Sequence, residues 1–312
     1  MQDLTVVICT HNRSVRLKNA LIWLNMAQRT DALGIRLLVV ANACTDDTIE
    51  FLGRYHEQAG EQSIPMDWIV EPAIGKSNAL NTAVPHIDSR LVAFVDDDHR
   101  VDGSYYESIA QAVAAYPQAG LICGRIIPDW DGTEPSWVHD QGPYRIYPLP
   151  VPRFDLGEQP CELSADGPIP GGGNLVMRTE VLKQVGGFST ELGPRGRGLE
   201  GSEDTDFVLR ALALGIHGQY APAIVQYHHV DSERLTLRYI LGKSYQRSRS
   251  ITRVRTGCSR IPAYLWRKMA TYTIKAGLSF SWTRTRFYLV RLMAVLGEMR
   301  GILDKATNQK YY

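Results

Sequence analysis

The sequence predicts an α/β protein in which helices flank a doubly wound, mostly parallel sheet. Through residues 1–231, short apolar runs of strand length alternate with segments of helical periodicity. No run of about 18 uncharged apolar residues predicts a membrane span. With 312 residues, of which 44% are hydrophobic and 21% charged, the chain can form a substantial core. Sheets of this type bind ligands just outside the carboxyl ends of their strands, so the residues that follow each strand are candidates for a site.

Each expected element has its own local signal. Residues 4–10 form an apolar run of strand length, and residues 15–28 carry leucines at helical spacing. Thr45 is an N-cap candidate, because its hydroxyl can accept a hydrogen bond from a first-turn N–H group. Residues 128–170 are rich in Pro, Gly, Trp and Tyr, which predicts an irregular excursion with substrate-specific loops. The predicted strands are residues 4–10, 35–41, 68–70, 91–95 and 120–127, and the predicted helices are residues 15–28, 45–59, 77–84 and 104–115.

Charge is distributed unevenly along the chain. Residues 232–312 contain 17 Lys and Arg but only 3 Asp and Glu, whereas residues 1–231 contain 17 and 30. The net charge of +1 hides this shift. It predicts two functional regions, residues 1–231 and a basic, aromatic-containing helical region over residues 232–312.

The cysteines and the N-terminus predict a cytoplasmic protein. The five cysteines are scattered, odd in number and without a Cys-x-x-Cys pair, as expected for reduced thiols. Met1, Gln2 and Asp3 lead directly into the first strand, without the basic and then apolar pattern of a signal peptide.

Three consecutive carboxylates, Asp96, Asp97 and Asp98, directly follow the apolar strand at residues 91–95. Adjacent anions repel one another, so the cluster needs a compensating charge. A divalent cation that also binds a substrate phosphate would supply it, because hard cations take carboxylate and phosphate oxygens. The alternative is a solvated acidic turn.

Six segments of the chain resemble the motifs of the family-2 glycosyltransferases. In chain order they are residues 5–13 (TVVICTHNR), 39–48 (VVANACTDDT), 75–81 (GKSNALN), 96–98 (DDD), 171–178 with 185–188 (GGGNLVMR and VGGF), and 203–210 (EDTDFVLR). All occur in the order typical of the family, and the resemblance extends from about residue 4 to residue 240. It implies a GT-A fold, a nucleotide-sugar donor, a divalent metal ion and inversion at the anomeric carbon.

The resemblance also implies roles for the carboxylates near residue 203. Asp204 is the candidate general base for the acceptor hydroxyl, and Glu203 is the close second. The alternative is an ordinary acidic first turn of a helix, which the helix dipole favours.

A metal site is implied as well. Asp98, with Asp96, would hold Mn²⁺ or Mg²⁺, which screens the charge that develops on the leaving phosphates. His228 resembles the histidine that completes this site in the family, and it aligns better than His229. The alternative is a partly buried histidine at the end of a strand.

The donor-binding residues are assigned by the same resemblance. Family members often have an aspartate where this chain has Ala41, so Asn42 or backbone groups would contact the nucleobase. Lys76 would pair with a phosphate or lie on the surface, and Gly171 to Gly173 would either allow close backbone approach or form a turn. The loop at residues 193–198 would close over the donor through Arg195 or Arg197, or remain a surface loop. The candidate donor-binding residues are Thr10, His11, Asn12, Arg13, Asn42, Lys76, Asp96, Asp97, Gly173 and Asn174.

The C-terminal region has apolar residues at helical spacing, interspersed arginines and several aromatic side chains. Such a segment can lie on an anionic membrane surface and so reach a lipid-linked acceptor. The alternatives are packing on the acidic catalytic domain and an oligomer interface. Nucleic-acid binding would explain the basic charge but nothing in residues 1–231.

The residues and the resemblance together predict an inverting, metal-dependent glycosyltransferase in the cytoplasm, either free or at the cytoplasmic face of the membrane. The resemblance implies a glycan or lipid-linked acceptor in polysaccharide or cell-envelope synthesis. A sugar-phosphate nucleotidyltransferase is disfavoured, because Thr10 to Arg13 replace a glycine-rich phosphate loop. A silent glycan- or membrane-binding module is disfavoured by the intact carboxylates.

Overall fold

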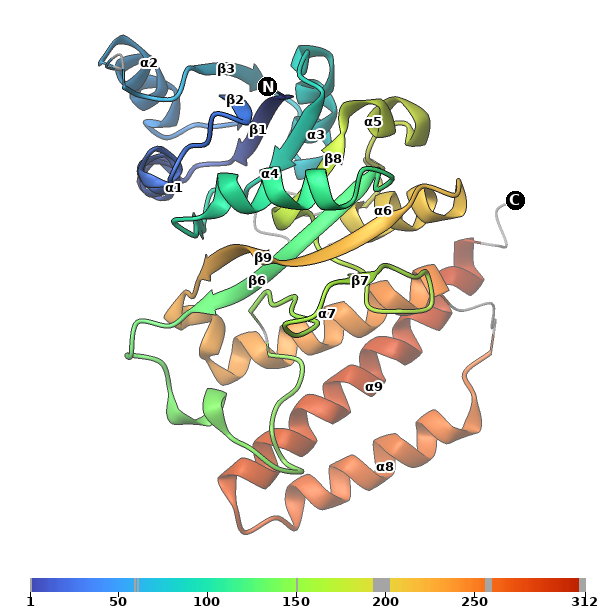
Figure 1. The fold of residues 1–312 in the computed structure, drawn as a ribbon. Coiled ribbons are helices and arrows are strands. Elements are labelled where there is room, and N and C mark those ends of the chain that lie inside the picture. The colour runs from blue at the N-terminus through green and yellow to red at the C-terminus, as the bar shows by residue number, and fades with distance from the viewer. Residues whose placement is uncertain are drawn as a thin grey trace. The chain divides into compact units, whose positions relative to one another are not determined.

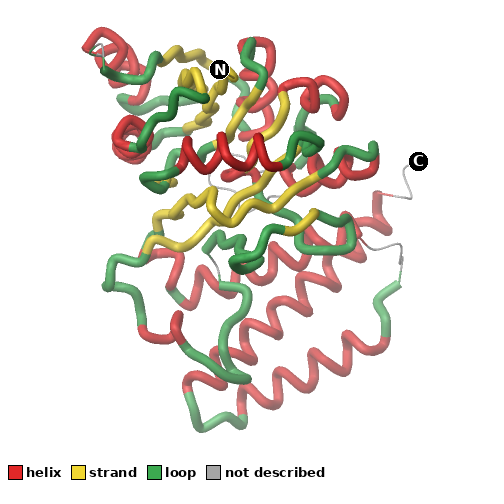
Figure 2. The backbone as a smooth tube through the Cα atoms, in the orientation of Figure 1, coloured by secondary structure: helices red, strands yellow, loops and turns green. Residues whose placement is uncertain are grey.

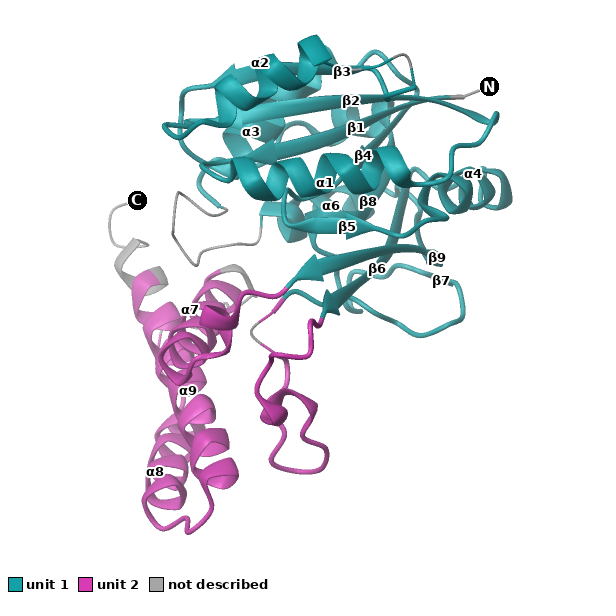
Figure 3. Cartoon of the chain, turned by 90° about the vertical axis from the view of Figure 1, so that its left-hand side faces the viewer, with its two compact units in different colours: residues 1–129, 152–197, 202–229 teal, residues 130–151, 198–201, 230–312 magenta. Residues whose placement is uncertain are grey.

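The computed structural model describes residues 2–58, 60, 62–149, 151–192, 203–255 and 260–308. The chain forms two compact units (Figure 3). The first contains residues 1–129, 152–197 and 202–229, and the second contains residues 130–151, 198–201 and 230–312. Among the helices of the described ranges, none combines the length and the apolar character that a membrane crossing requires.

The first unit is built around a mixed sheet whose strand order is β3-β2-β1-β4-β8-β6-β9-β5 (Figure 1). The strands β3, β2, β1 and β4 are parallel, whereas β8 runs antiparallel to both of its neighbours, β4 and β6. The short β7 pairs with β9 beside this path. The strands are β1 (Gln2–Thr10), β2 (Leu33–Asn42), β3 (Met66–Glu71), β4 (Leu91–Phe94), β5 (His99–Val101), β6 (Leu121–Asp129), β7 (Cys161–Glu162), β8 (Leu175–Arg178) and β9 (Gly218–His229).

Helices cover both faces of this sheet (Figure 2). Successive side chains of a strand point to opposite faces, and in β1 Val6 belongs to one apolar core whereas Val7 belongs to the other. The helices α1, α2 and α4 pack on the first core, and α3, α5 and α6 pack on the second. The helices are α1 (Ser14–Met26), α2 (Thr48–Gln58), α3 (Lys76–Ala83), α4 (Tyr105–Ala115), α5 (Thr179–Val185) and α6 (Glu203–Ala213).

The predicted α/β class is confirmed, but two local predictions need correction. The helix predicted from Thr45 begins at Thr48, because the Asp46 carboxylate accepts the Thr48 N–H at 3.1 Å and so takes the capping role. The Thr45 N–H instead donates to the Asn12 side chain at 2.6 Å. The strand β5 was not predicted, because three residues are too few for a periodic signal.

The second unit consists of α7 (Leu237–Arg255), α8 (Ala263–Gly277) and α9 (Trp282–Asn308), together with the segment at residues 130–151. The helices α8 and α9 share an apolar cluster formed by Leu265, Val295, Met299 and Ile302. Glycines allow α9 to approach α7 closely, since a Cβ at Gly297 would lie 2.1 Å from the Tyr245 carbonyl oxygen. The segment 130–151 is joined to α9 by an ion pair between Asp140 and Arg286 at 3.2 Å.

Candidate functional site

The acidic cluster lies between β4 and β5, at the carboxyl end of β4. The Thr10 hydroxyl donates to Asp97 at 2.7 Å, and the Arg13 guanidinium donates to Asp97 at 3.0 Å and to Asp98 at 3.2 Å. Burial, followed by the charge of Asp98, raises the pKa of Asp97 to about 6. The residues after β1 therefore hold two of the three carboxylates in place.

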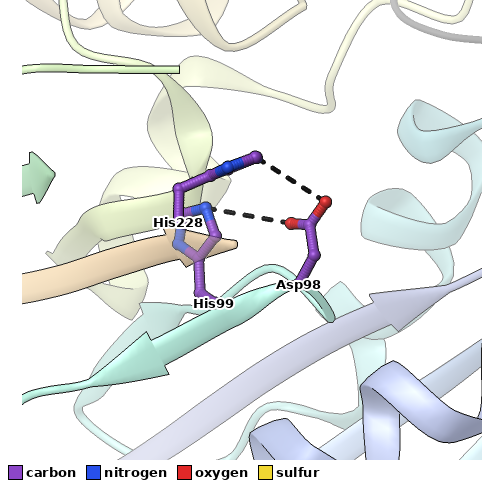
Figure 4. Close-up of side chains that lie close together, drawn as sticks. All are labelled: Asp98, His99 and His228. Carbon is purple, nitrogen blue, oxygen red and sulfur yellow. Dashed lines mark ion pairs between the residues drawn. The ribbon is translucent and has the colours of Figure 1, made fainter. Parts of the chain in front are cut away.

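Asp98 forms a compact group with two histidines, His99 and His228 (Figure 4). His99 begins β5 and His228 lies in β9, and the two are direct register partners in this antiparallel pair. The Asp98 carboxylate lies 3.6 Å from Nε2 of His228 and 4.0 Å from Nε2 of His99. One atom from each residue falls within 4.8 Å of the others, and all three residues are less than 9% exposed.

The His99 ring is oriented so that a nitrogen lone pair faces the carboxylates. Its Nδ1 donates to Oε1 of Gln226 at 2.6 Å, and Gln226 is fixed by its own donation to Asn174 at 3.0 Å and to the Tyr105 hydroxyl at 3.0 Å. Nε2 of His99 is buried and has no hydrogen-bond partner among the described residues. A buried acceptor without a donor costs free energy, which a metal ion would recover. The donor set of one carboxylate and two imidazoles therefore fits a divalent cation.

Asp96 has a different partner. Its Oδ1 accepts from Nζ of Lys76, the first residue of α3, at 2.6 Å, and its Oδ2 lies 3.9 Å from Nε2 of His99. Burial acts to lower the pKa of Lys76, but nearby carboxylates, Asp96 first and then Asp204, outweigh burial and raise it. Lys76 is therefore a fixed cation that faces both the metal-ligand group and the carboxylates of α6.

The carboxylates Glu203 and Asp204 begin α6. Asp204 accepts a hydrogen bond from the Gly172 N–H. Glu203 is 3% exposed, and its Oε2 has no hydrogen-bond partner within the described ranges. Burial, together with the charge of Asp204, raises the pKa of Glu203 to about 8. Glu203 is therefore protonated at neutral pH.

Two adjacent glycines, Gly172 and Gly173, lie between the two halves of the site, the metal-ligand group and the carboxylates of α6. A Cβ at Gly172 would lie 2.8 Å from Asp204, and a Cβ at Gly173 would lie 2.6 Å from Cε1 of His99 and 2.8 Å from Asp96. Only glycine fits at these positions without displacing the site residues. At Gly173 the backbone lies close to the side chains of His99 and Asp96, and its predicted approach to a ligand stays a prediction.

The other predicted donor-binding residues have structural contacts of their own. Nδ1 of His11 lies 2.7 Å from the Asn42 carbonyl oxygen, and Asn12 adopts φ 53° while its side chain accepts from the Thr45 and Asp46 N–H groups. The Asn42 amide donates to the Ala73 carbonyl at 2.7 Å and accepts from the Gly75 N–H at 2.8 Å. The Asn174 amide is buried and donates to the Arg125 and Ile224 carbonyl groups.

The structure distinguishes between two neighbouring candidate metal ligands, His228 and His229. His228 faces the cluster, whereas the adjacent His229 is exposed. Arg195 and Arg197 lie outside the described residues. Sequence reasoning missed His99 and Gln226. The position of His99 directly after three aspartates was the one available signal, and its pairing with His228 depends on strand register.

Comparisons with known proteins identify the family and the fold of the chain. The family model described as Glycosyl transferase family 2 matches residues 5–186. A mannosyltransferase from Pyrobaculum calidifontis, solved with GDP-Man and Mn²⁺, is similar with a TM-score of 0.58 at 16% identity, over 99% of this chain and 87% of the other. Residues 1–349 of TarS from S. aureus, solved with UDP, are similar with a TM-score of 0.53 at 16% identity, over 100% and 93% of the two chains. The same part of TarS with UDP-GlcNAc has a TM-score of 0.53 at 14% identity, over 100% and 93%. No curated protein matched the sequence.

At these identities the solved structures support the GT-A fold alone, whereas the family match covers more than half of the chain. The chain belongs to the family-2 glycosyltransferases, and it is a glycosyltransferase with the α/β GT-A fold.

Proposed function

We propose that this enzyme transfers a sugar from a nucleotide-diphosphate donor to an acceptor hydroxyl with inversion at the anomeric carbon. The observation that carries the proposal is the turn at Gly172 and Gly173. Asp204 lies against Gly172, and His99, which forms a group with Asp98 and His228, lies against the adjacent Gly173. A candidate base and a candidate metal site thus face one reaction centre. The similar enzymes were solved with GDP-Man and UDP-GlcNAc, which supports a nucleotide-sugar donor.

Asp98, His99 and His228 would hold the metal ion, with Asp96 at its edge. When bound, a divalent cation supplies Lewis-acid stabilisation of the leaving diphosphate. The two imidazoles favour Mn²⁺ over Mg²⁺, because Mg²⁺ takes oxygen ligands and retains water. Lys76 and Arg13 add fixed positive charge on either side of the acidic cluster.

Asp204 acts as the general base in this proposal. The acceptor oxygen attacks the anomeric carbon from the face opposite the diphosphate, and its proton passes to the Asp204 carboxylate. The Gly172 N–H holds that carboxylate in position. Glu203, protonated at neutral pH, contributes no second charge to repel the diphosphate.

The acceptor is proposed to be a glycan or a lipid-linked glycan in polysaccharide or cell-envelope synthesis. The second unit supports contact with a membrane, because its α8–α9 turn exposes Leu278, Phe280 and Trp282. Lys268 and Lys275 lie on the preceding helix. Apolar and aromatic side chains beside lysines are typical of proteins that bind anionic membrane surfaces.

The Asp204→Asn variant tests the assignment of the base. We expect nucleotide release in the presence of acceptor to fall by about 10²–10⁴-fold, since a positioned base contributes about that much. Binding of the nucleotide, measured by calorimetry, should persist. The matched control is Asp206→Asn. Asp206 lies in the same helical turn as Asp204, and its carboxylate pairs with Arg210. Full activity of Asp204→Asn, or equal losses in both variants, would show that the base lies elsewhere.

A further inference from the structure

The second unit contains a cavity of about 190 Å³ that the catalytic proposal does not use. Three of its walls are formed by residues 145–149, by α7 and by α9, all within this unit. Four basic side chains line it, and no Asp or Glu is among the described residues around it. The four are Arg145, Lys243, Arg247 and Arg291.

Two of the basic side chains of the cavity, Arg247 and Arg291, differ from neighbouring arginines in their carboxylate contacts. On the same helices, Arg249 pairs with Asp304 at 2.5 Å, and Arg286 pairs with Asp140 at 3.2 Å. Arg247 and Arg291, in contrast, form no ion pair with any described carboxylate. Burial lowers the pKa of the Arg247 guanidinium, although Arg247 and Arg291 both keep exposed surface. An anionic ligand would supply the counter-ion that the described residues do not provide for these two arginines.

The remainder of the cavity wall is apolar. Ile240 on α7 and Phe287, Val290 and Ala294 on α9 contribute hydrocarbon or aromatic surface beside the cations. The Arg291 guanidinium lies 5.2 Å from the centre of the Phe287 ring, so one charge is held over the apolar wall. An inorganic anion would leave this half of the cavity without contacts, whereas an amphiphile would use both halves.

The cavity also lies close along α9 to the exposed α8–α9 turn. Phe287 follows Trp282 by five residues, which corresponds to about 7.5 Å along a helix. Leu278 and Phe280 are 72% and fully exposed. A membrane that accommodated this turn would bring its head groups to the level of the cavity, since interfacial side chains enter the boundary by about 5–10 Å.

We propose that this cavity binds the phosphate group of a membrane lipid, with the basic side chains around the phosphate and the apolar wall against the first carbons of the chain. A phosphate monoester is the best match, because several guanidinium and ammonium groups can donate to its oxygens at once. The further role of such a lipid as the carrier of the acceptor rests on the proposed glycosyl transfer, whereas binding of the lipid does not.

The test measures sedimentation of the full chain with vesicles. Neutral phosphatidylcholine vesicles carry either phosphatidic acid, a phosphate monoester, or phosphatidylserine, adjusted to equal surface charge. A second pair carries polyprenyl phosphate or the uncharged polyprenol. The pocket variant is Arg247→Gln with Arg291→Gln. The control is Arg238→Gln with Arg253→Gln, which removes two exposed charges outside the cavity.

We expect the unmodified chain to bind phosphatidic acid vesicles roughly tenfold more tightly than phosphatidylserine vesicles, and polyprenyl phosphate vesicles more tightly than polyprenol vesicles. The pocket variant should lose both preferences, while the control keeps them despite weaker binding to all anionic vesicles. Absence of the preferences, or their equal loss in both variants, would overturn the proposal in favour of diffuse charge. If inorganic phosphate in solution bound as tightly as the phosphate lipids in vesicles, the proposal that the ligand is a lipid would be refuted. Nucleotide release without acceptor is measured on the unmodified chain and on the same variants. If no nucleotide were released, that result would count against the transferase proposal and not against the binding of the lipid.

Discussion

At the scale of single residues, the site depends on which atoms of His99 and Glu203 carry protons. Gln226 holds the proton on Nδ1 of His99, and so Nε2 offers its lone pair to a metal ion. Burial, together with the charge of the adjacent Asp204, favours the protonated form of Glu203. The orientation of His99 depends on a partner from a distant part of the chain.

The His99→Ala variant tests the ligand that sequence reasoning missed. Removing one of three ligands should weaken Mn²⁺ binding by about 10–100-fold or more, because even outer partners of a metal site contribute that much. Electron paramagnetic resonance of free Mn²⁺ measures the affinity directly. The control is His229→Ala, which removes the adjacent exposed imidazole. Unchanged Mn²⁺ affinity in His99→Ala would exclude His99 as a ligand.

The Glu203→Gln variant tests the pKa of the buried carboxyl. The pKa of Glu203 is raised from 4.5 to about 8 in the folded state, so folding favours the protonated form. Its contribution to stability is fully present below about pH 4.5 and is lost as the pH rises through 8. The glutamine side chain cannot ionise. We therefore expect the melting temperature of the variant, relative to that of the unmodified chain, to be higher at pH 9 than at pH 5 by ~2 °C or more.

Thermal melting at several pH values provides this comparison. The matched control is Glu180→Gln, an exposed carboxylate in the first turn of α5, which should leave the pH profile unchanged. If Glu203→Gln melted in parallel with the unmodified chain from pH 5 to pH 9, the carboxyl would have to be ionised throughout.

The motifs shared with the family-2 glycosyltransferases predicted Asp98, Asp204 and His228 as site residues. The structure groups Asp98 with His228 and brings Asp204 against Gly172, and the roles of these residues stay predictions. His99 could not be named, since its role requires the register that pairs it with His228. Asn174 was expected among the donor-binding residues, and in the structure its amide oxygen accepts a hydrogen bond from Gln226.

At the scale of elements, glycines set the distances between neighbouring parts. The turn at Gly172–Asn174 contacts both halves of the site, and α9 packs on α7 through Gly297 and Gly301. At each position a methyl group would meet backbone or a site side chain.

The Gly173→Ala variant tests the first of these approaches. The added methyl group would have to displace His99 and Asp96, so we expect metal-dependent nucleotide release to fall by at least about tenfold while the chain remains folded. The control is Gly53→Ala in α2, where the methyl group meets nothing within 4 Å. The control should keep its activity and gain about 0.5–1 kcal/mol of stability. An active Gly173→Ala variant would show that the site tolerates a wider turn.

The Gly297→Ala variant tests the second approach. A methyl group 2.1 Å from the Tyr245 carbonyl oxygen forces α9 away from α7, which should cost about 1–3 kcal/mol in the free energy of unfolding. The matched control is Gly242→Ala on α7, with open space around the new methyl group and an expected gain of about 1 kcal/mol. Denaturant unfolding measures both. Equal stabilities would mean that the two helices adjust without loss of contacts.

Element boundaries were predicted where periodicity was strong. The pattern of Leu17, Leu21 and Leu24 located α1 to within two residues at its C-terminal end. The boundary prediction failed where two neighbouring side chains could both cap a helix, because Asp46 rather than Thr45 caps α2. The antiparallel insertion of β8 between β4 and β6 has no local signal, because it depends on contacts among three separate segments.

At the scale of the whole molecule, the charge asymmetry coincides with a second structural unit. Its helices α7, α8 and α9 carry the basic residues that the sequence placed after residue 231. Residues 130–151 also belong to this unit, through the Asp140–Arg286 ion pair and an apolar cluster that includes Val138 and Leu235 (Figure 3). The sequence did not show this membership, since a segment without periodicity gives no indication of its tertiary partners.

The central claim is that the chain cleaves a nucleotide-sugar donor at a metal site built on Asp98. The most direct measurement is nucleotide release from UDP-, GDP- and dTDP-sugars in Mn²⁺, Mg²⁺ or EDTA, with the unmodified chain and with Asp98→Asn. We expect release from one donor, faster with Mn²⁺ than with Mg²⁺, that is lost in EDTA and in Asp98→Asn. Release that persists in EDTA and in Asp98→Asn, or the absence of both release and metal-dependent nucleotide binding for every donor, would contradict it.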